Sequence, residues 1–262
     1  MENKIFIKKE TMKGIADAIR AKDGTTEEIA VMDMAERIEA IGGINYLEYC
    51  TSFSLWSLNI FEKSKVELTL PRTTRLDAAF YVDKNDSDTE GRTNTTVEEL
   101  IVHSPNIMTD MSTAFGQNNY YADKKLKKIV MDFETEAWLW SYCFNNLQAL
   151  THIEGIPINL SPIAGDGYTT SMFDACRELV EVRFKGTMSY SMKIKYSTKL
   201  SKDSILSLMA CLSDEAIGKT VTFSQTAVNT AFETSSGAAD GSTSTEWAEL
   251  IATKPNWTVS LV

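Results

Sequence analysis

Metal ligation and acid–base catalysis depend on histidines and carboxylates, and histidines are scarce in this chain. Only His103 and His152 occur, and their positions match none of the spacings used for metal ligation. Sugar-cleaving enzymes need only two carboxylates at a set separation, which a sequence does not reveal. Six carboxylates leave that chemistry open: Asp110, Asp132, Glu134, Glu136, Glu154 and Asp174. Turns and solvated faces explain these residues better, so we expect no enzyme and no cofactor, and a glycan hydrolase is a lesser alternative.

The most polar run of the chain, residues 83–96, resembles a calcium-binding loop in part. Asp86, Asp88 and Glu90 occupy alternate positions, as calcium ligands often do. Counted from Asp86, however, the twelfth position holds Val97 where a bidentate glutamate is required. We therefore interpret the run as a solvated insert and expect no metal site.

Four cysteines lie far apart along the chain and form no CxxC pair: Cys50, Cys143, Cys176 and Cys211. That density is too low for a disulfide scaffold, and the missing pairs disfavour zinc. Cys143 and Cys176 stand beside regularly spaced aromatic and apolar residues. We expect both to be buried free thiols.

Aromatic residues in or beside polar inserts are the best candidates for ligand binding. Tyrosine and tryptophan offer rigid, amphipathic contact area at low entropic cost, and nearby Gly, Ser and Asn add adaptable hydrogen bonds. Four residues meet this description: Tyr120, Tyr121, Trp138 and Tyr168. The alternative interpretation is that they pack in the core or cover a strand edge.

Composition describes an ordinary acidic globular protein. Of 262 residues, 43% are hydrophobic and 24% charged, which is enough to bury a core. The net charge of −10 opposes binding to nucleic acid or to an anionic membrane surface, and we expect neither. Residues 1–10 lack the apolar run of a secretory signal, and no stretch has the length of a membrane span. We expect synthesis in a bacterial cytoplasm and exit by assembly or lysis.

Five short apolar stretches recur along the middle of the chain. Counted from their first residues, they are 32, 29, 24 and 29 positions apart, which is the range of stacked supersecondary units. Strands of three or four residues cannot bury an apolar side alone, so such units stack and share a core. The stretches are Leu68–Leu70, Leu100–Val102, Ile129–Met131, Ile153–Gly155 and Val182–Phe184.

The best-formed unit carries a resemblance to a known class. Residues 173–184 follow the pattern Phe-x-x-Cys-x-x-Leu-x-x-Val-x-Phe, which resembles the BspA-like leucine-rich repeats. The resemblance implies a mainly β fold with some α, a leucine-rich-repeat-like solenoid over residues 45–200. An ordinary β-sandwich with coincidental spacing is the alternative fold.

Residues 8–44 read as a helical hairpin module. Ile15 and Ile19 lie on one face of a helix that ends at Asp23-Gly24, and a second helix is predicted from Asp33. So small a unit is marginal alone, and we expect its apolar residues to mediate assembly: Ile15, Ile19, Ile38 and Ile41. Residues 10–20 and 33–38 are similar to an N-terminal module of phage and prophage tail and fibre proteins from Gram-positive hosts.

The C-terminal residues 201–262 read as an α/β cap. We predict a helix over 201–212, a strand over 220–223 followed by a Ser/Gly/Ala-rich loop to 237, a helix from Ser244 and a strand over 257–261. The predicted domains are therefore 1–44, 45–200 and 201–262.

The two resemblances together imply a virion component. We expect a homo-oligomeric phage or phage-derived tail or baseplate protein that joins other tail proteins through its N-terminal module. Its loops would bind a host-surface glycan or protein, which makes it a receptor-binding protein. A structural adaptor or decoration subunit without receptor binding is the first alternative, and an envelope glycan hydrolase is the second.

Overall fold

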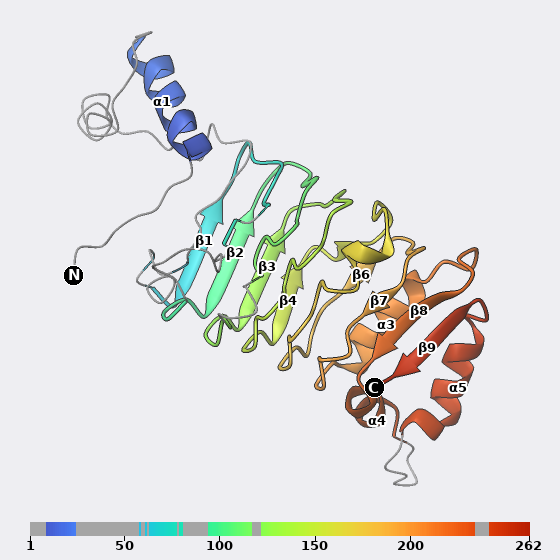
Figure 1. Ribbon diagram of the computed structural model, residues 1–262. Helices are drawn as coiled ribbons and strands as arrows, with labels where there is room; N and C mark the ends of the chain where they lie inside the picture. Colours follow the sequence, from blue (N-terminus) through green and yellow to red (C-terminus); the bar gives the residue numbers. More distant parts are fainter. Residues whose placement is uncertain are drawn as a thin grey trace.

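The computed structural model describes residues 9–24, 58, 61, 63–77, 79–80, 94–116, 122–233 and 241–262 (Figure 1). The chain opens with helix α1, Lys9–Asp23, which ends before Gly24 as the sequence predicts. Four parallel strands then lie side by side in chain order. They are β1 (Lys65–Thr69), β2 (Glu99–His103), β3 (Lys128–Asp132) and β4 (His152–Gly155).

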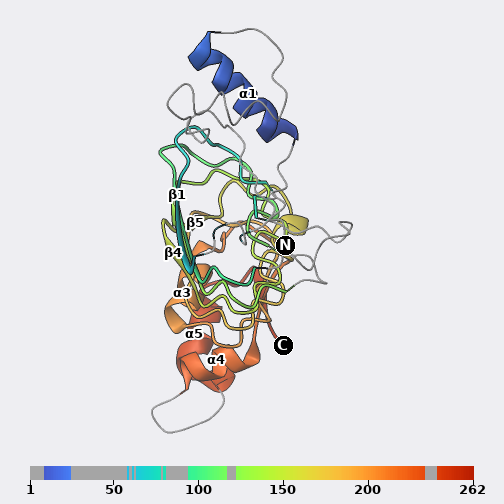
Figure 2. The ribbon, with the colours of Figure 1, turned by 90° about the vertical axis from the view of Figure 1, so that its left-hand side faces the viewer.

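Burial of alternate residues determines which face of these strands is turned inward. Their pairing is in register, with Leu100 beside Val66 on one side and Ile129 on the other. Alternate residues of β1–β3 point inward and are buried and apolar, while the residues between them, which are charged or polar apart from Ile101 and Val130, face outward. Figure 2 shows these strands on one side of the molecule and the return segments on the other. We call each strand with its return segment a layer.

A column of stacked phenylalanine rings fills the interior between the strands and the return segments. Phe80, Phe115, Phe144 and Phe173 come from four successive layers, with ring centroids 5.3–5.8 Å apart and interplanar angles of 8–11°. All four side chains are buried. Offset stacking adds about 0.5–1.5 kcal/mol per pair to the burial of the rings, so the column ties the layers together.

The C-terminal half combines short strands with helices. Strands β5 (Ile158–Asn159) and β6 (Phe184–Lys185) form one parallel sheet; β7 (Met192–Lys193), β8 (Lys219–Phe223) and β9 (Trp257–Leu261) form another. The helices are η4 (Asp166–Tyr168), α3 (Lys202–Cys211), α4 (Gln225–Phe232), η5 (Gly241–Thr243) and α5 (Thr245–Ala252). Ser201 and Ser244 cap α3 and α5 by accepting backbone N–H bonds, as N-cap serines do.

This arrangement overturns the expected fold class. A mainly β, leucine-rich-repeat-like solenoid requires one ladder through all five apolar stretches. The described strands instead divide into three parallel sheets of four, two and three strands with helices beside them, which is α/β-like. In the fifth stretch only Phe184 lies in a strand, because the ladder is interrupted after β4 and helix α3 packs next to β6.

Other sequence predictions have mixed outcomes. The strands at 220–223 and 257–261 and the helices at 201–212 and from Ser244 are confirmed to within a few residues. The loop predicted after β8 is wrong, since α4 forms there and buries Ala227, Val228 and Phe232. The second helix of the predicted hairpin lies outside the described residues. In the part of the chain that the structure describes, no helix has the length and apolar character needed to span a bilayer.

Candidate ligand-binding surfaces

Two of the four aromatic residues predicted to bind ligand lie together on the surface. Trp138, in the return segment after β3, is 48% exposed. Tyr168 of η4, one layer further on, meets it edge to face, with ring centroids 5.9 Å apart. Tyr168 is half buried and packs against the hydrophobic core. The pair therefore combines an exposed indole with a half-buried phenol ring that contacts it, whereas Tyr120 and Tyr121 lie outside the described residues.

Asp166 holds the Tyr168 segment in place. Its carboxylate accepts the backbone N–H of Ser191 at 2.5 Å and pairs with Lys219 Nζ at 3.2 Å. Partial burial alone would raise the pKa of Asp166, but the Ser191 bond and the Lys219 charge outweigh it and lower the pKa. The Thr169 hydroxyl also donates to the Ser191 carbonyl. These contacts join η4 to the next layer and to β8, so Tyr168 is positioned by residues distant in sequence.

The predicted assembly residues are only partly described. Ile15 and Ile19 lie on α1 and are 9% and 0% exposed, and they are not part of the core that the stacked layers share. The chain itself thus already covers these two side chains. Ile38 and Ile41 lie outside the described residues, and their role in assembly stays a prediction.

Cys143 and Cys176 are buried free thiols, as the sequence predicts. Burial raises the pKa of the Cys143 thiol well above its usual range and that of Cys176 to about 12. The Cys176 thiol donates to the Phe144 carbonyl at 2.9 Å. Both thiols therefore belong to the packed interior and not to a reactive site.

The outward face of the β1–β4 sheet carries charged side chains paired across the strands. His103 on β2 lies between two carboxylates, with Nδ1 2.7 Å from Asp132 and Nε2 2.9 Å from Glu67. The hydrogen bond to Asp132 is the main cause of its raised pKa; partial burial opposes the rise and Glu67 adds to it. Lys128 bridges Glu99 at 3.7 Å and Glu154 at 2.8 Å in the same manner.

Two hollows open on this face where adjacent layers differ in length. The β2 and β3 layers pair at His103 with Asp132 and again at Met108 with Thr135. Between these two pairings, the β2 layer contains more residues than the β3 layer. The β4 layer likewise runs from 152 to 158 against 181 to 184 in the next one. The extra residues bulge outward, and Gly155 allows this with a φ of 90°. This length difference also explains why the ladder breaks after β4.

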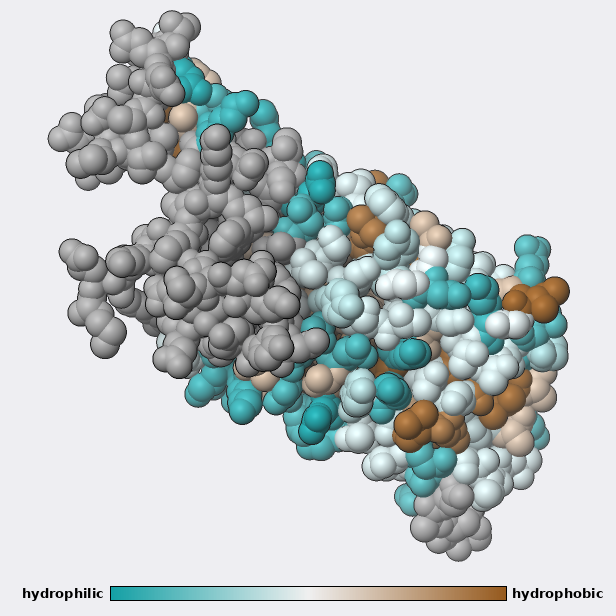
Figure 3. All heavy atoms as spheres, in the orientation of Figure 1, coloured by the Kyte–Doolittle hydropathy of each residue, from teal (hydrophilic) through white to brown (hydrophobic). Residues whose placement is uncertain are grey.

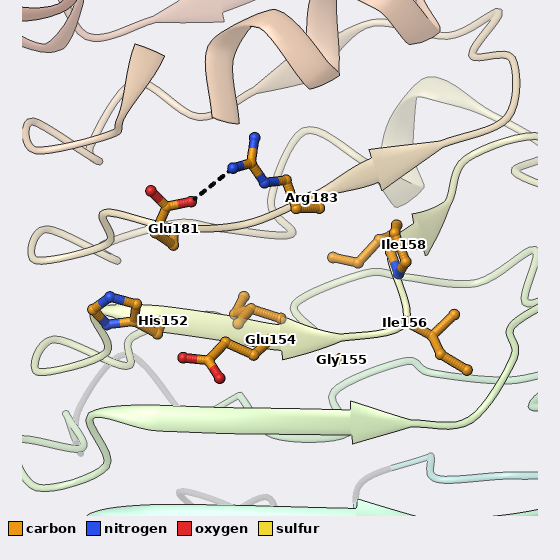
Figure 4. A pocket seen from close by; sticks show the side chains of 9 residues that line it. His152, Glu154, Gly155, Ile156, Ile158, Glu181 and Arg183 are labelled. Carbon is orange, nitrogen blue, oxygen red and sulfur yellow. Dashed lines mark ion pairs between the residues drawn. The ribbon is translucent and has the colours of Figure 1, made fainter. Parts of the chain in front are cut away.

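The hollows have volumes of about 360 and 220 Å³ and share one residue, Ile156. We call them together the corner groove. Figure 4 shows the smaller hollow, with Glu154 projecting from β4 and Glu181 and Arg183 projecting from the neighbouring segment. The larger hollow is lined by His103, Ser104, Pro105, Ile107, Asp132, Phe133, Glu134 and Ile156. None of the described aromatic candidates lines either hollow.

Carboxylates of the groove are engaged in ion pairs. Asp132 bonds His103, Glu134 pairs with Lys185, and Glu154 pairs with Lys128. Glycoside hydrolysis needs two carboxylates that are free to act on the sugar, and each of these three is held by a basic side chain. Within the described ranges, no three His, Cys, Asp or Glu residues are grouped so as to hold a metal ion. The paired carboxylates are hydrogen-bond acceptors held in fixed positions.

Figure 3 shows the face of the molecule that carries the return segments. Over its described part, apolar surface is divided into separate patches among polar residues. A mosaic of this kind is typical of proteins that recognise polar ligands through a few apolar contacts.

No family model matches the chain, and neither a curated protein nor a solved structure shows significant similarity to it.

Proposed function

We propose that the protein is a receptor-binding component of a phage tail or of a phage-derived particle, and that it contacts a host-surface glycan through Trp138 and Tyr168. The observation that carries this proposal is the exposed indole of Trp138 braced by a ring of the adjacent layer. A sugar buries its C–H face against an aromatic ring, and nearby polar groups fix its orientation.

Two further points support the proposal. The phage-type origin follows from the resemblance of residues 10–20 and 33–38 to the N-terminal module of tail and fibre proteins. The ion pairs of Asp132, Glu134 and Glu154 disfavour the hydrolase alternative. The same stacked layers would also suit a structural adaptor, and binding to cells separates the two functions.

The test is to measure how Trp138→Ala changes binding to host material. Labelled protein is incubated with cells from a panel of Gram-positive strains and with wall polysaccharide purified from them. We expect wild type to bind at least one strain and Trp138→Ala to bind it about tenfold more weakly, a loss of about 1.4 kcal/mol. The melting temperature should stay within about 2 °C, because surface substitutions usually change stability by less than about 0.5 kcal/mol.

Tyr196→Ala is the matched control. Tyr196 is 39% exposed on a later turn, where Lys195 lies 4.8 Å from its ring centroid. Its replacement removes a similar exposed aromatic surface away from the Trp138–Tyr168 pair and should leave binding unchanged. Equal losses from both variants would contradict the proposed site. A wild-type protein that binds no strain and no polysaccharide would favour the structural adaptor.

A further inference from the structure

The two hollows of the corner groove lie on successive layers and meet at Ile156. The larger hollow lies against β2 and β3, and the smaller one lies between β4 and the segment that carries Arg183. Parallel strands are spaced about 4.8 Å apart, so three layer spacings give a length of about 14 Å. The groove is long enough for an extended ligand of several units.

Charge within the groove is compensated by the chain itself. Each lining carboxylate lies beside a basic side chain: Asp132 beside His103 at 2.7 Å, Glu134 beside Lys185, Glu154 beside Lys128 at 2.8 Å and Glu181 beside Arg183 at 3.6 Å. A charged ligand would have to displace one of these partners. Paired carboxylates nevertheless retain lone pairs that accept hydrogen bonds from neutral donors.

The backbone along the groove is also already paired. Three backbone N–H groups donate to backbone carbonyls of the next layer, with N···O distances of 2.8–3.1 Å. They are Ser104 to Asp132, Met108 to Glu134 and Ile158 to Arg183. A peptide that binds by strand addition needs unpaired edge groups, and these groups are occupied. Side chains must therefore make the contacts.

We infer that the corner groove binds a neutral, hydroxyl-rich oligosaccharide, at a site separate from the Trp138–Tyr168 pair. Hydroxyl groups of the sugar donate to the fixed carboxylate oxygens and accept from the guanidinium of Arg183. Apolar side chains in the lining, among them Ile107 and Ile156, receive the C–H faces of the sugar. Ile107 is 45% exposed and offers an open apolar contact in the larger hollow.

The test is a titration of the ¹⁵N-labelled full chain followed by NMR. The neutral probes are the trisaccharides N-acetylchitotriose, maltotriose and mannotriose. The charged probes are the glucosamine trimer and trigalacturonate, which have the same length. At least one neutral trisaccharide should shift the amide signals of residues 104–107 and 154–158, and the charged trimers should shift them less. Trp138→Ala should bind the same probe as wild type, which keeps this result independent of the proposed receptor contact.

Ile107→Ala tests the apolar contact, and Ile217→Ala is its matched control because Ile217 is 80% exposed and outside the groove lining. We expect Ile107→Ala to weaken binding roughly fivefold and Ile217→Ala to leave it unchanged. The inference is overturned by any of three results. These are no shift with any neutral trisaccharide, stronger binding of a charged trimer, or shifts that fall outside the two segments.

Discussion

The stacked strands β1–β4 and the C-terminal region from α3 to β9 both contain parallel strands, but they fill their interiors differently. Behind β1–β4, each layer contributes one ring to the phenylalanine column, and each ring stacks on that of the next layer. In the C-terminal region the ring contacts form one cluster, in which Trp247 of α5 packs against Phe223 of β8 and Phe232 of α4. Both sets of rings belong to one hydrophobic core, but the column extends along the stack whereas the ring contacts of Trp247 are local.

The difference indicates how each region responds to a defect. A ring in the middle of the column supports two neighbours, so its loss weakens the layers on both sides. A ring in the local cluster supports helices and strands that are close together. Repeated layers gain stability from nearest-neighbour interfaces, and a terminal region can close the stack. The following three predictions test this comparison, from the largest expected effect to the smallest.

Replacing Phe144 with alanine should destabilise the protein most. Phe144 stacks between Phe115 and Phe173 and also contacts Trp140. A buried Phe→Ala change costs about 3–5 kcal/mol, and we expect about 4 here from urea denaturation followed by fluorescence. Hydrogen exchange should show lost protection in β3 and β4.

Phe232→Ala is the comparison variant in the local cluster. It should lower protection in α4, α5 and β8 while β1–β4 keep theirs, because its ring contact is with Trp247 of α5 and not with the phenylalanine column. If both variants loosen the same segments, the two sets of rings are one cooperative unit and the distinction fails.

Gly155→Ala should have the next largest effect. Gly155 has a φ of 90°, and a Cβ at this position would lie 2.3 Å from the Met131 carbonyl oxygen on β3. We expect a loss of about 3 kcal/mol, from backbone strain and from the displaced β3–β4 pairing. Gly218→Ala, at a φ of 70° with nothing within 4 Å of its Cβ, should cost only about 1 kcal/mol. Equal losses in the unfolding free energy would show that the close approach to β3 is unimportant.

The smallest effect concerns pH and His103. The pKa of His103 in the folded protein is raised above 6.5. The contribution of protonated His103 to folding stability is therefore complete below about pH 6.5 and is lost as the pH rises through the raised pKa. The side chain is one-third exposed and solvent screens the pair, so the change should be below about 1 kcal/mol. The unfolding free energy of wild type minus that of His103→Gln should fall between pH 6 and 8. A difference that rises with pH contradicts the carboxylate–imidazole contact.

Much of the local structure could be predicted from the sequence. Four of the five apolar stretches overlap the strands β1–β4, because inward residues in a short strand must alternate with polar ones. Ser201 and Ser244 marked the helix starts through their capping chemistry. Helix α4 was missed because the Ser-, Gly- and Ala-rich segment that follows its residues suggested a loop, whereas tertiary burial of Phe232 stabilises a helix.

The binding surfaces were predicted less completely. The four aromatic candidates were chosen singly, and nothing in their spacing indicated that Trp138 and Tyr168, thirty positions apart, would meet. No pattern of residue types in the sequence indicated the corner groove. Its only trace was the unequal spacing of the apolar stretches, which becomes a hollow when layers of different length lie side by side.

The sequence by itself determined the positions of strands β1–β4, of helices α3 and α5 and of the last strand, and the burial of Cys143 and Cys176, because these depend on local pattern and on the need to hide apolar side chains. Only the tertiary structure decided that the strands separate into three sheets, that four phenylalanines stack and that Ile156 joins two hollows. These features depend on how many residues each layer uses between shared bridges. That count has meaning only once the layers lie against one another.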